Sequence, residues 1–211
     1  MKIIPFFLIF FTTVLLHSQQ PMNLTLAKNA VSDYYTSGKY DAEVDSVVNE
    51  AIFRLHQITV KPGDAAVFDV DETALSNLPH IMSLDFGFDF SMWNKWVMDG
   101  KSKAIPQVRR LYDTLVAYGV RIVFLTGRTD EYFPSTKANL TATGYVLFDT
   151  LITKNESYKQ TSMAEYKEKT RCALESTGRH IIMCIGDQLS DLHGSCTGIK
   201  VKIPNYIYIM E

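Results

Sequence analysis

Residues 67–77 read VFDVDETALSN, and this stretch decides the fold. The apolar run at residues 65–68 predicts a buried strand, and two aspartates, Asp69 and Asp71, follow it one residue apart. If the extended backbone persists through Asp71, both carboxylates point to one face at the strand's carboxyl end. Two anions this close need a cation, a shared proton or a reaction that uses their repulsion. The plainer alternative is an acidic turn after a strand.

Strands and helices alternate along the rest of the chain. The predicted strands after the first are residues 120–126, 145–152, 180–185 and 199–203. The predicted helices between them are residues 106–118, 132–143 and a segment from Thr161 or Ser162 to Thr177. This alternation requires crossover connections, so we predict an α/β fold with a Rossmann-like parallel sheet and helices on both faces. Helical periodicity at residues 25–58, interrupted at Gly38, predicts an N-terminal helical segment.

An aromatic-rich insert follows the first strand, at about residues 78–104. It contains Phe86, Phe88, Phe90, Trp93 and Trp96, and Ser91 is placed to cap a short helix over residues 92–98. A cap of this kind can exclude water and grip a substrate. The alternative is a small satellite core, and the two roles are compatible.

Composition and charge narrow the function classes. The 211 residues are 46% hydrophobic and 21% charged, which fits one globular domain, residues 24–211, with its N-terminal helices at 24–60. The net charge of −2 gives no reason to expect a nucleic acid polymer or an anionic membrane as a partner. Oligomeric state leaves no readable signal in the sequence.

The first residues are typical of a secretory signal peptide, residues 1–18. An apolar run at residues 3–16 follows Lys2 and ends before the small residue Ser18, and it is shorter than the roughly 20 residues of a membrane span. We therefore predict a secreted or extracellular protein without stable membrane insertion after cleavage. The location would be periplasmic in a Gram-negative bacterium, with lysosomal or vacuolar alternatives in a eukaryote. The alternative to cleavage is an uncleaved membrane anchor.

Three cysteines, Cys172, Cys184 and Cys196, have no zinc-site spacing. Because Cys184 lies in an apolar run and is expected to be a buried thiol, we predict a disulfide between Cys172 and Cys196. Asn23, Asn139 and Asn155 match the glycosylation pattern, which matters only in a eukaryotic source.

Polar residues gather where three predicted strands end. Asp69 and Asp71 follow the first strand, Thr126 ends the second, and Asp187 and Asp191 follow the strand at residues 180–185. Sites in open parallel sheets form outside the carboxyl ends of the strands, so these side chains should meet there. Hard oxygen ligands suit Mg²⁺, which takes a few carboxylates together with a substrate phosphate. Phosphoryl transfer is the reaction that uses such a site.

Residues 69–73, 125–128 and 186–191 resemble the motifs of the haloacid dehalogenase (HAD) superfamily. Residues 68–79 and 185–192 are more closely similar to its secreted acid phosphatases, the branch that includes plant acid phosphatases and vegetative storage proteins and is related to bacterial class B and C enzymes. The resemblance covers roughly residues 24–204. It implies a Mg²⁺-dependent phosphomonoesterase, an acid phosphatase, that hydrolyses small phosphate esters through an aspartyl-phosphate intermediate. The alternative is a non-catalytic storage or binding protein of the same fold.

The resemblance also implies roles for the acidic residues. Asp69 would be the nucleophile, because a carboxylate attacks without prior deprotonation. Asp71 would act as general acid and then as base, with a pKa raised by burial and by the charge of Asp69. The carboxylates of Asp69 and Asp187 and the backbone carbonyl of Asp71 would hold Mg²⁺, and Asp191 would position the metal's waters or the lysine.

The phosphate oxygens would be bound by Thr126, by the amides that follow it at Gly127 and Arg128, and by a lysine. Arg128 either contacts substrate or pairs with an acidic group. Lys154, Lys159, Lys167 and Lys169 all lie in the interval where the family has its lysine. We choose Lys167, which follows a tyrosine as in the family and leaves about 20 residues for a helix and a strand before Asp187. Lys159 is the second choice.

Overall fold

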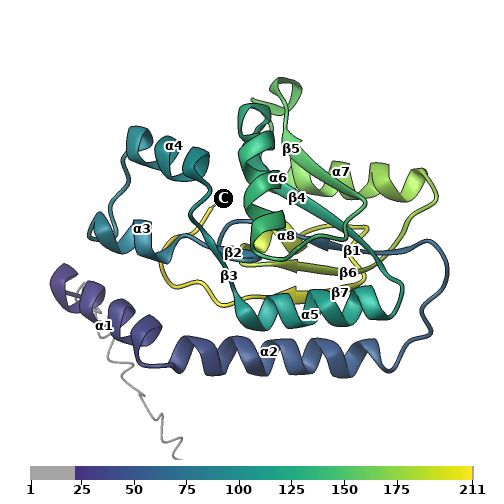
Figure 1. Ribbon diagram of the computed structural model, residues 1–211, viewed down its shortest axis with the longest axis horizontal. Coiled ribbons are helices and arrows are strands. Elements are labelled where there is room, and N and C mark those ends of the chain that lie inside the picture. The colour runs from purple at the N-terminus through teal and green to yellow at the C-terminus, as the bar shows by residue number, and fades with distance from the viewer. Residues whose placement is uncertain (1–21, 211) are drawn as a thin grey trace, which may run out of the picture.

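The computed structural model describes residues 22–210, and its main body is a five-stranded parallel sheet in the order β5-β4-β1-β6-β7 (Figure 1). The sheet strands are β1 (Asp64–Phe68), β4 (Arg121–Thr129), β5 (Thr150–Lys154), β6 (His180–Gly186) and β7 (Ile199–Lys202). The helices are α1 (Leu24–Thr36), α2 (Lys39–Leu55), α3 (Leu78–Ser83), α4 (Phe90–Asp99), α5 (Pro106–Ala117), α6 (Phe133–Ala142), α7 (Met163–Ser176) and α8 (Leu189–Leu192), with 3-10 turns η1 (Asp130–Tyr132) and η2 (Glu156–Tyr158).

β1 is the central strand, and all five of its residues are buried. Its alternate side chains enter two different cores, because successive residues of a strand point to opposite faces. Phe68 packs with residues of α2 and α5, whereas Val67 packs with residues of α7. Figure 1 shows α2 and α5 on one side of the sheet and α7 on the other. The predicted α/β fold with helices on both faces is confirmed.

The N-terminal helical segment and the cap are also present. Gly38 adopts a φ of 85° between α1 and α2, a conformation that glycine accepts without steric cost. After β1 the chain leaves the sheet to form α3 and α4. The cap is closed at its base by β2 (Leu75–Ser76) and β3 (Lys103–Ala104), which pair antiparallel.

The structure corrects two local predictions. Asp89, not Ser91, caps α4, since its Oδ1 accepts a hydrogen bond from the amide of Met92 at 2.8 Å. Both residue types are favoured N-caps, so residue type alone does not separate them. The strand predicted from residue 145 begins only at Thr150. Tyr145 is buried in an irregular segment, and its hydroxyl donates to the carbonyl of Ala74 at 2.9 Å, so its apolar character reflects core packing of a loop.

Cys172 of α7 and Cys196, in the segment between α8 and β7, form the predicted disulfide, and Cys184 is a buried free thiol. Of the three sequons, Asn139 is buried and donates to the carbonyl of Ser102 at 2.8 Å. Asn23 and Asn155 are exposed. Glycosylation could therefore reach Asn23 and Asn155 but not a buried Asn139.

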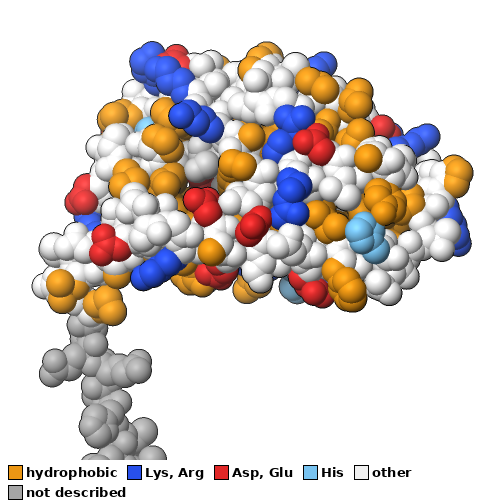
Figure 2. All heavy atoms as spheres, turned by 60° about the horizontal axis from the view of Figure 1, so that its bottom comes forward, with side chains coloured by type: hydrophobic (Ala, Val, Ile, Leu, Met, Phe, Trp, Pro, Cys, Tyr) orange, Lys and Arg blue, Asp and Glu red, His pale blue; other side chains and the backbone are white. Residues whose placement is uncertain are grey.

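The surface carries charges of both signs. Figure 2 shows acidic and basic side chains interspersed over the face that it presents, in keeping with the net charge of −2. Within residues 22–210, no helix has the length and apolar character needed to cross a bilayer. The predicted signal peptide lies outside the described residues.

Candidate active site

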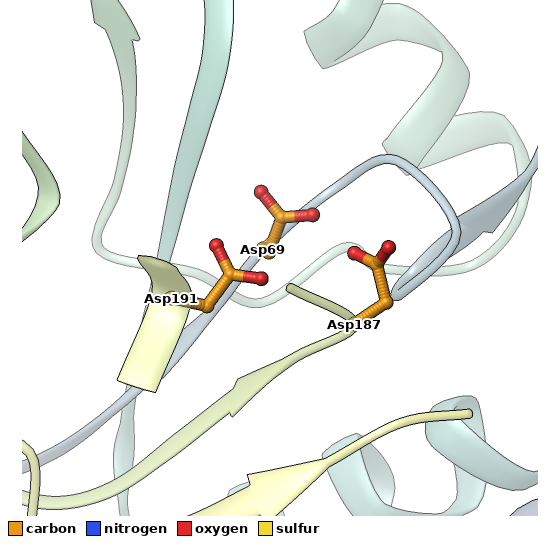
Figure 3. A group of neighbouring side chains, drawn as sticks. All are labelled: Asp69, Asp187 and Asp191. Atoms are coloured by element: carbon orange, nitrogen blue, oxygen red, sulfur yellow. The ribbon is translucent and has the colours of Figure 1, made fainter. Parts of the chain in front are cut away.

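Three buried carboxylates meet at the carboxyl edge of the sheet. Asp69 directly follows β1, Asp187 follows β6, and Asp191 lies on α8, and Figure 3 shows the three side chains facing a common space. Their exposed fractions are 7%, 2% and 5%. One oxygen from each carboxylate lies within 4.8 Å of the others. The adjacent central strands β1 and β6 produce this meeting, because their pairing continues to Phe68 and Ile185, just before the two aspartates.

Lys167 enters the same cluster from α7. Its Nζ donates to Oδ1 of Asp69 at 2.5 Å and also contacts Asp191. Burial lowers the pKa of Lys167, but the carboxylates of Asp191 and Asp69 outweigh this effect and raise it, so the side chain stays charged. Lys159 instead lies on the surface, 69% exposed, and pairs with Glu156 at 3.4 Å. Only Lys167 of these two lysines can therefore contact a group held at Asp69.

Asp71 is not one of the three clustered carboxylates. Arg128 forms a bidentate ion pair with it, with the shortest contact, from Nη2 to Oδ1, at 2.6 Å, and Asn77 donates to Oδ1 at 2.7 Å. Burial raises the pKa of Asp71, but the charge and hydrogen bonds of Arg128, with the bond from Asn77, lower it overall. The raised pKa expected from the sequence is therefore wrong. The sequence reasoning counted the repulsion from Asp69 but not the arginine.

Thr126, Gly127 and Arg128 lie on β4 beside this acidic group. The pairing of β4 with β5 is interrupted between Leu125 and Thr129, a local irregularity of the kind that redirects side chains at functional sites. Oγ1 of Thr126 accepts the amide of Arg128 at 3.2 Å. Of the two roles left open for Arg128, pairing with an acidic group is the one observed.

Some residues around the acidic groups were not identified from the sequence, among them Glu72, Asn77, Asn205 and Tyr208. Glu72 is buried, and its carboxylate accepts from the amide of Asn77 at 2.6 Å and from the hydroxyl of Tyr208 at 2.6 Å. Asn205 donates to Asp187 at 2.7 Å. Glu72 and Asn77 belong to the opening stretch, where a polar residue that is buried could have been suspected. Tyr208 and Asn205 follow the last strand and carry no motif that points to the site.

The cap is connected to the acidic loop through Asn77. Nε1 of Trp96, on α4, donates to Oδ1 of Asn77 at 2.9 Å, while Ser102 donates to the same oxygen at 2.6 Å. The guanidinium of Arg128 lies 5.8 Å from the ring centre of Trp93, within cation–π range. Trp96 therefore has a packing role, whereas Phe88 and Phe90 are 73% and 65% exposed. The packing role that the sequence left open is therefore observed, and the lid role stays a prediction.

A comparison with known families decides the identity of this fold and site. The profile described as "HAD superfamily, subfamily IIIB (Acid phosphatase)" matches residues 17–211. The chain belongs to this acid phosphatase family. The resemblance seen in the three motifs is thereby confirmed, as is the predicted enzyme class, a phosphatase, whose family implies small phosphate esters as substrates.

Curated relatives come from plants. The chain is 34% identical over 188 residues to the stem 28 kDa glycoprotein of Glycine max, a match that covers 86% of this chain and 74% of the relative. It is 32% identical over 184 residues to acid phosphatase 1 of Solanum lycopersicum, covering 84% and 72% of the two chains. It is 31% identical over 189 residues to vegetative storage protein 1 of Arabidopsis thaliana, covering 86% and 69%. The family thus includes proteins named for storage as well as for catalysis.

A solved structure shows the same fold. The class C acid phosphatase from Bacillus anthracis with tungstate bound matches with a TM-score of 0.72 at 21% identity, over 88% of this chain and 85% of that one. At this identity the likeness concerns the fold.

HAD phosphatases generally use a divalent metal, and the acidic cluster fits one. Its three buried carboxylates offer hard oxygen ligands, and the pKa values of Asp69 and Asp187 are raised by burial and by the neighbouring carboxylates. Lys167 lowers the pKa of Asp69 but does not offset burial and the neighbouring carboxylates together. A divalent cation among these oxygens would favour their ionised forms, so the donor set suits the ion. Asp191 belongs to this cluster, and it contacts Lys167, one of the two roles that the sequence analysis gave it.

Proposed function

We propose that this protein is a Mg²⁺-dependent phosphomonoesterase that hydrolyses small phosphate esters through an aspartyl phosphate on Asp69. The observation that carries the proposal is the contact of Lys167 with Asp69, inside a buried cluster with Asp187 and Asp191. A carboxylate, a cation and oxygen ligands for a divalent ion then surround one small space. Mg²⁺, when bound, would neutralise charge between the nucleophile and the phosphate.

In the first step an oxygen of Asp69 attacks phosphorus, and the bond from phosphorus to the ester oxygen breaks. Lys167 and Thr126 would bind the equatorial oxygens of the transferring group, where charge spreads in the transition state. Asp71 would give its proton to the departing alcohol oxygen. In the second step Asp71 would take a proton from water, the water oxygen would bond to phosphorus, and the bond to Asp69 would break to release phosphate.

Arg128 would control the pH at which Asp71 holds a proton. Because the ion pair favours the ionised carboxylate, Asp71 would hold a proton chiefly at acidic pH or when an entering phosphate draws the guanidinium toward itself. An acidic optimum follows from this arrangement. Exposed Phe88 and Phe90 and the half-buried Trp93 would contact the alcohol portion of the substrate, so a ring-containing ester such as a nucleotide suits them.

The disulfide supports the proposed location. Disulfides persist in oxidising compartments, and the Cys172–Cys196 bridge therefore favours a secreted, periplasmic or vacuolar protein over a cytosolic one. The names of relatives that contain the word glycoprotein point the same way for those proteins. We propose cleavage near Ser18.

A phosphate-release assay tests the function. The purified protein, given an aryl phosphate and Mg²⁺ at mildly acidic pH, should release phosphate and should lose this activity on addition of EDTA. Asp69→Asn should reduce turnover by several orders of magnitude, because the amide is a poor nucleophile. Asp149→Asn, which changes an aspartate in a surface ion pair, is the matched control and should retain activity.

Trapping the intermediate tests whether the mechanism is covalent. Acid quenching during turnover should leave one phosphoryl group on the peptide that contains Asp69, detectable by mass spectrometry. A turnover of Asp69→Asn equal to that of the wild type would rule out the covalent mechanism. The second candidate, a storage or binding protein, is favoured by the names of some relatives and would be supported if the wild type released no phosphate from nucleotides, sugar phosphates or phosphoamino acids.

A further inference from the structure

The segment after β7 returns to the acidic site instead of leaving the sheet. In Figure 1 this yellow segment passes the carboxyl edge and ends, in that view, between α4 and α6. Pro204 is buried at its start. Tyr206 then fastens the segment to the N-terminal helices, where its amide donates to the hydroxyl of Tyr35 at 3.2 Å and its own hydroxyl donates to Glu43 at 3.2 Å.

Asn205 reaches the acidic cluster directly. Its Nδ2 donates to Oδ2 of Asp187 at 2.7 Å, and its Oδ1 accepts the amide of Ile207 at 2.8 Å. The second bond fixes which end of the amide faces Asp187, so the group presented to the carboxylate is a donor. Thr73 donates to the other oxygen, Oδ1, at 3.1 Å. The Asp187 carboxylate is therefore held at both oxygens by neutral donors from distant parts of the chain.

The same segment is attached at two further points. The hydroxyl of Tyr208 donates to Glu72 at 2.6 Å, on the turn that follows Asp71. The amide of Met210 donates to Oε1 of Gln188 at 2.9 Å, and Nε2 of Gln188 donates to Oδ2 of Asp187 at 2.5 Å. These anchors follow Asn205, and on its other side the amide of Ile203 donates to the carbonyl of Gly186 at 2.9 Å. The position of Asn205 relative to Asp187 is therefore fixed by the fold rather than by one bond.

We infer that Asn205 is a positioning residue of the metal site, which fixes the orientation of the Asp187 carboxylate for a divalent cation. The inference rests on the Mg²⁺ site of the proposed function. Hydrogen-bond partners of metal-binding carboxylates set the direction of the ligand oxygen, and their loss weakens metal binding by roughly 10- to 100-fold. Asn205 would act through Asp187 and not on the substrate, so its loss should change the Mg²⁺ dependence more than the turnover at saturating Mg²⁺.

Isothermal titration of the full protein with MgCl₂, without substrate, tests this role. Asn205→Ala should raise the Kd for Mg²⁺ by roughly 10- to 100-fold. Tyr206→Phe is the matched control, because it removes a bond from the neighbouring residue of the same segment to Glu43, away from the acidic cluster. Its Kd should equal that of the wild type. Asn205→Leu, which keeps the approximate shape but has no donor, replaces Asn205→Ala if the latter does not fold, and the same increase is expected.

Three results would overturn the inference. One is a Kd for the Asn205 variant within about twofold of the Tyr206→Phe value, well below the expected range. Another is a lower melting temperature of the metal-free variant with an unchanged Kd, which would indicate a structural role only. The third is absence of Mg²⁺ binding by the wild type. The titration contains no phosphate ester, so a wild type that binds Mg²⁺ but releases no phosphate would contradict the proposed function and leave this inference to be decided by the Kd values.

Discussion

At the scale of single residues, burial and neighbouring charges distinguish side chains that look alike in the sequence. Lys167 and Lys159 both follow a tyrosine, but Lys167 is 4% exposed beside two carboxylates, whereas Lys159 is on the surface. Lys167→Ala should lower kcat by several orders of magnitude, because buried charges at the transferring phosphate would lose their counter-charge. Lys159→Ala should leave kcat nearly unchanged. Steady-state kinetics of the two purified variants measures the difference, and equal losses would reject the assignment.

Arg128 provides a test based on pH. Burial raises the pKa of Asp71, and the guanidinium of Arg128 lowers it below the ordinary value, so removing the charge should move the pKa upward. The proposed first step needs the protonated acid, and activity therefore falls as the pH rises through this pKa. Arg128→Met should shift the alkaline limb of the kcat profile to higher pH, whatever its effect on the maximum.

Thr136→Val is the control for that experiment. Its hydroxyl accepts a hydrogen bond from Nη1 of Arg128 at 3.0 Å, and its removal leaves the guanidinium charge in place. The limb should then move far less than in Arg128→Met. An alkaline limb that stays at the wild-type pH in Arg128→Met would show that Asp71 is not the group that controls it.

The residues of the site were predictable where they stand at the end of an apolar run that indicates a strand. Asp69, Thr126 and Asp187 each follow or end an apolar run, and the parallel sheet brings such ends together. The pKa of Asp71 was not predictable, because it depends on an ion pair to a residue 57 positions away. Asn205 gave no signal for a related reason: its function depends on where the segment after β7 returns, and neither periodicity nor composition encodes that path.

At the scale of elements, the cap contains a buried group that is sensitive to acid. His80 on α3 is 6% exposed, its Nε2 has no hydrogen-bond partner, and its ring stacks on Trp96 with centres 5.3 Å apart. Burial lowers the pKa of His80, opposed by the charge of Asp89. In the unfolded chain a histidine has a pKa near 6.5, so below about pH 6.5 the unfolded state binds more protons than the folded state. The cap should therefore lose stability as the pH falls through this window.

His80→Phe should reduce that loss, because it keeps an aromatic ring against Trp96 and removes the proton-binding group. Melting temperatures recorded from about pH 7 to about pH 5, the range around the unfolded pKa, should fall less for this variant than for the wild type. His56→Phe changes an exposed histidine and should keep the wild-type pH dependence. The prediction is wrong if His80→Phe and the wild type lose stability in parallel.

Among the elements, those with a clear period were predicted and the others were not. α5 and α7 follow their predicted ranges closely, since each has a favourable start, Pro106 in one and the Ser162 cap in the other. The segment at residues 145–149 failed because a loop whose aromatic residues enter the core has the same apolar composition as a strand. The presence of a cap was readable from the aromatic insert, but its attachment through Asn77 was not, because a buried amide looks like any polar residue in a sequence.

At the scale of the whole molecule, the disulfide joins the helix that carries the site's lysine to the segment that follows the helix of one of its aspartates. Cys172 lies on α7, which carries Lys167, and Cys196 lies after α8, which carries Asp191. The bridge spans 24 residues, and closing a loop of this length stabilises a folded protein by about 3.5 kcal/mol through the entropy of the unfolded chain. For a chain of 211 residues, its loss should lower the melting temperature by roughly 7 to 14 °C.

The double variant Cys172→Ser/Cys196→Ser measures this effect by calorimetry, with reductant as an internal control. The wild type should lose thermal stability when dithiothreitol is added, whereas the double variant should start at the lower value and not change further. Because Cys184 is buried and unpaired in both proteins, its presence does not account for a difference between them. Lys167 is held to Asp191 by contacts of its own, so the site should re-form in the folded double variant, with kcat at low temperature close to that of the wild type. Equal melting temperatures with and without the bridge would contradict the prediction, and a large loss of kcat in the folded variant would show that the bridge also fixes the distance between α7 and α8.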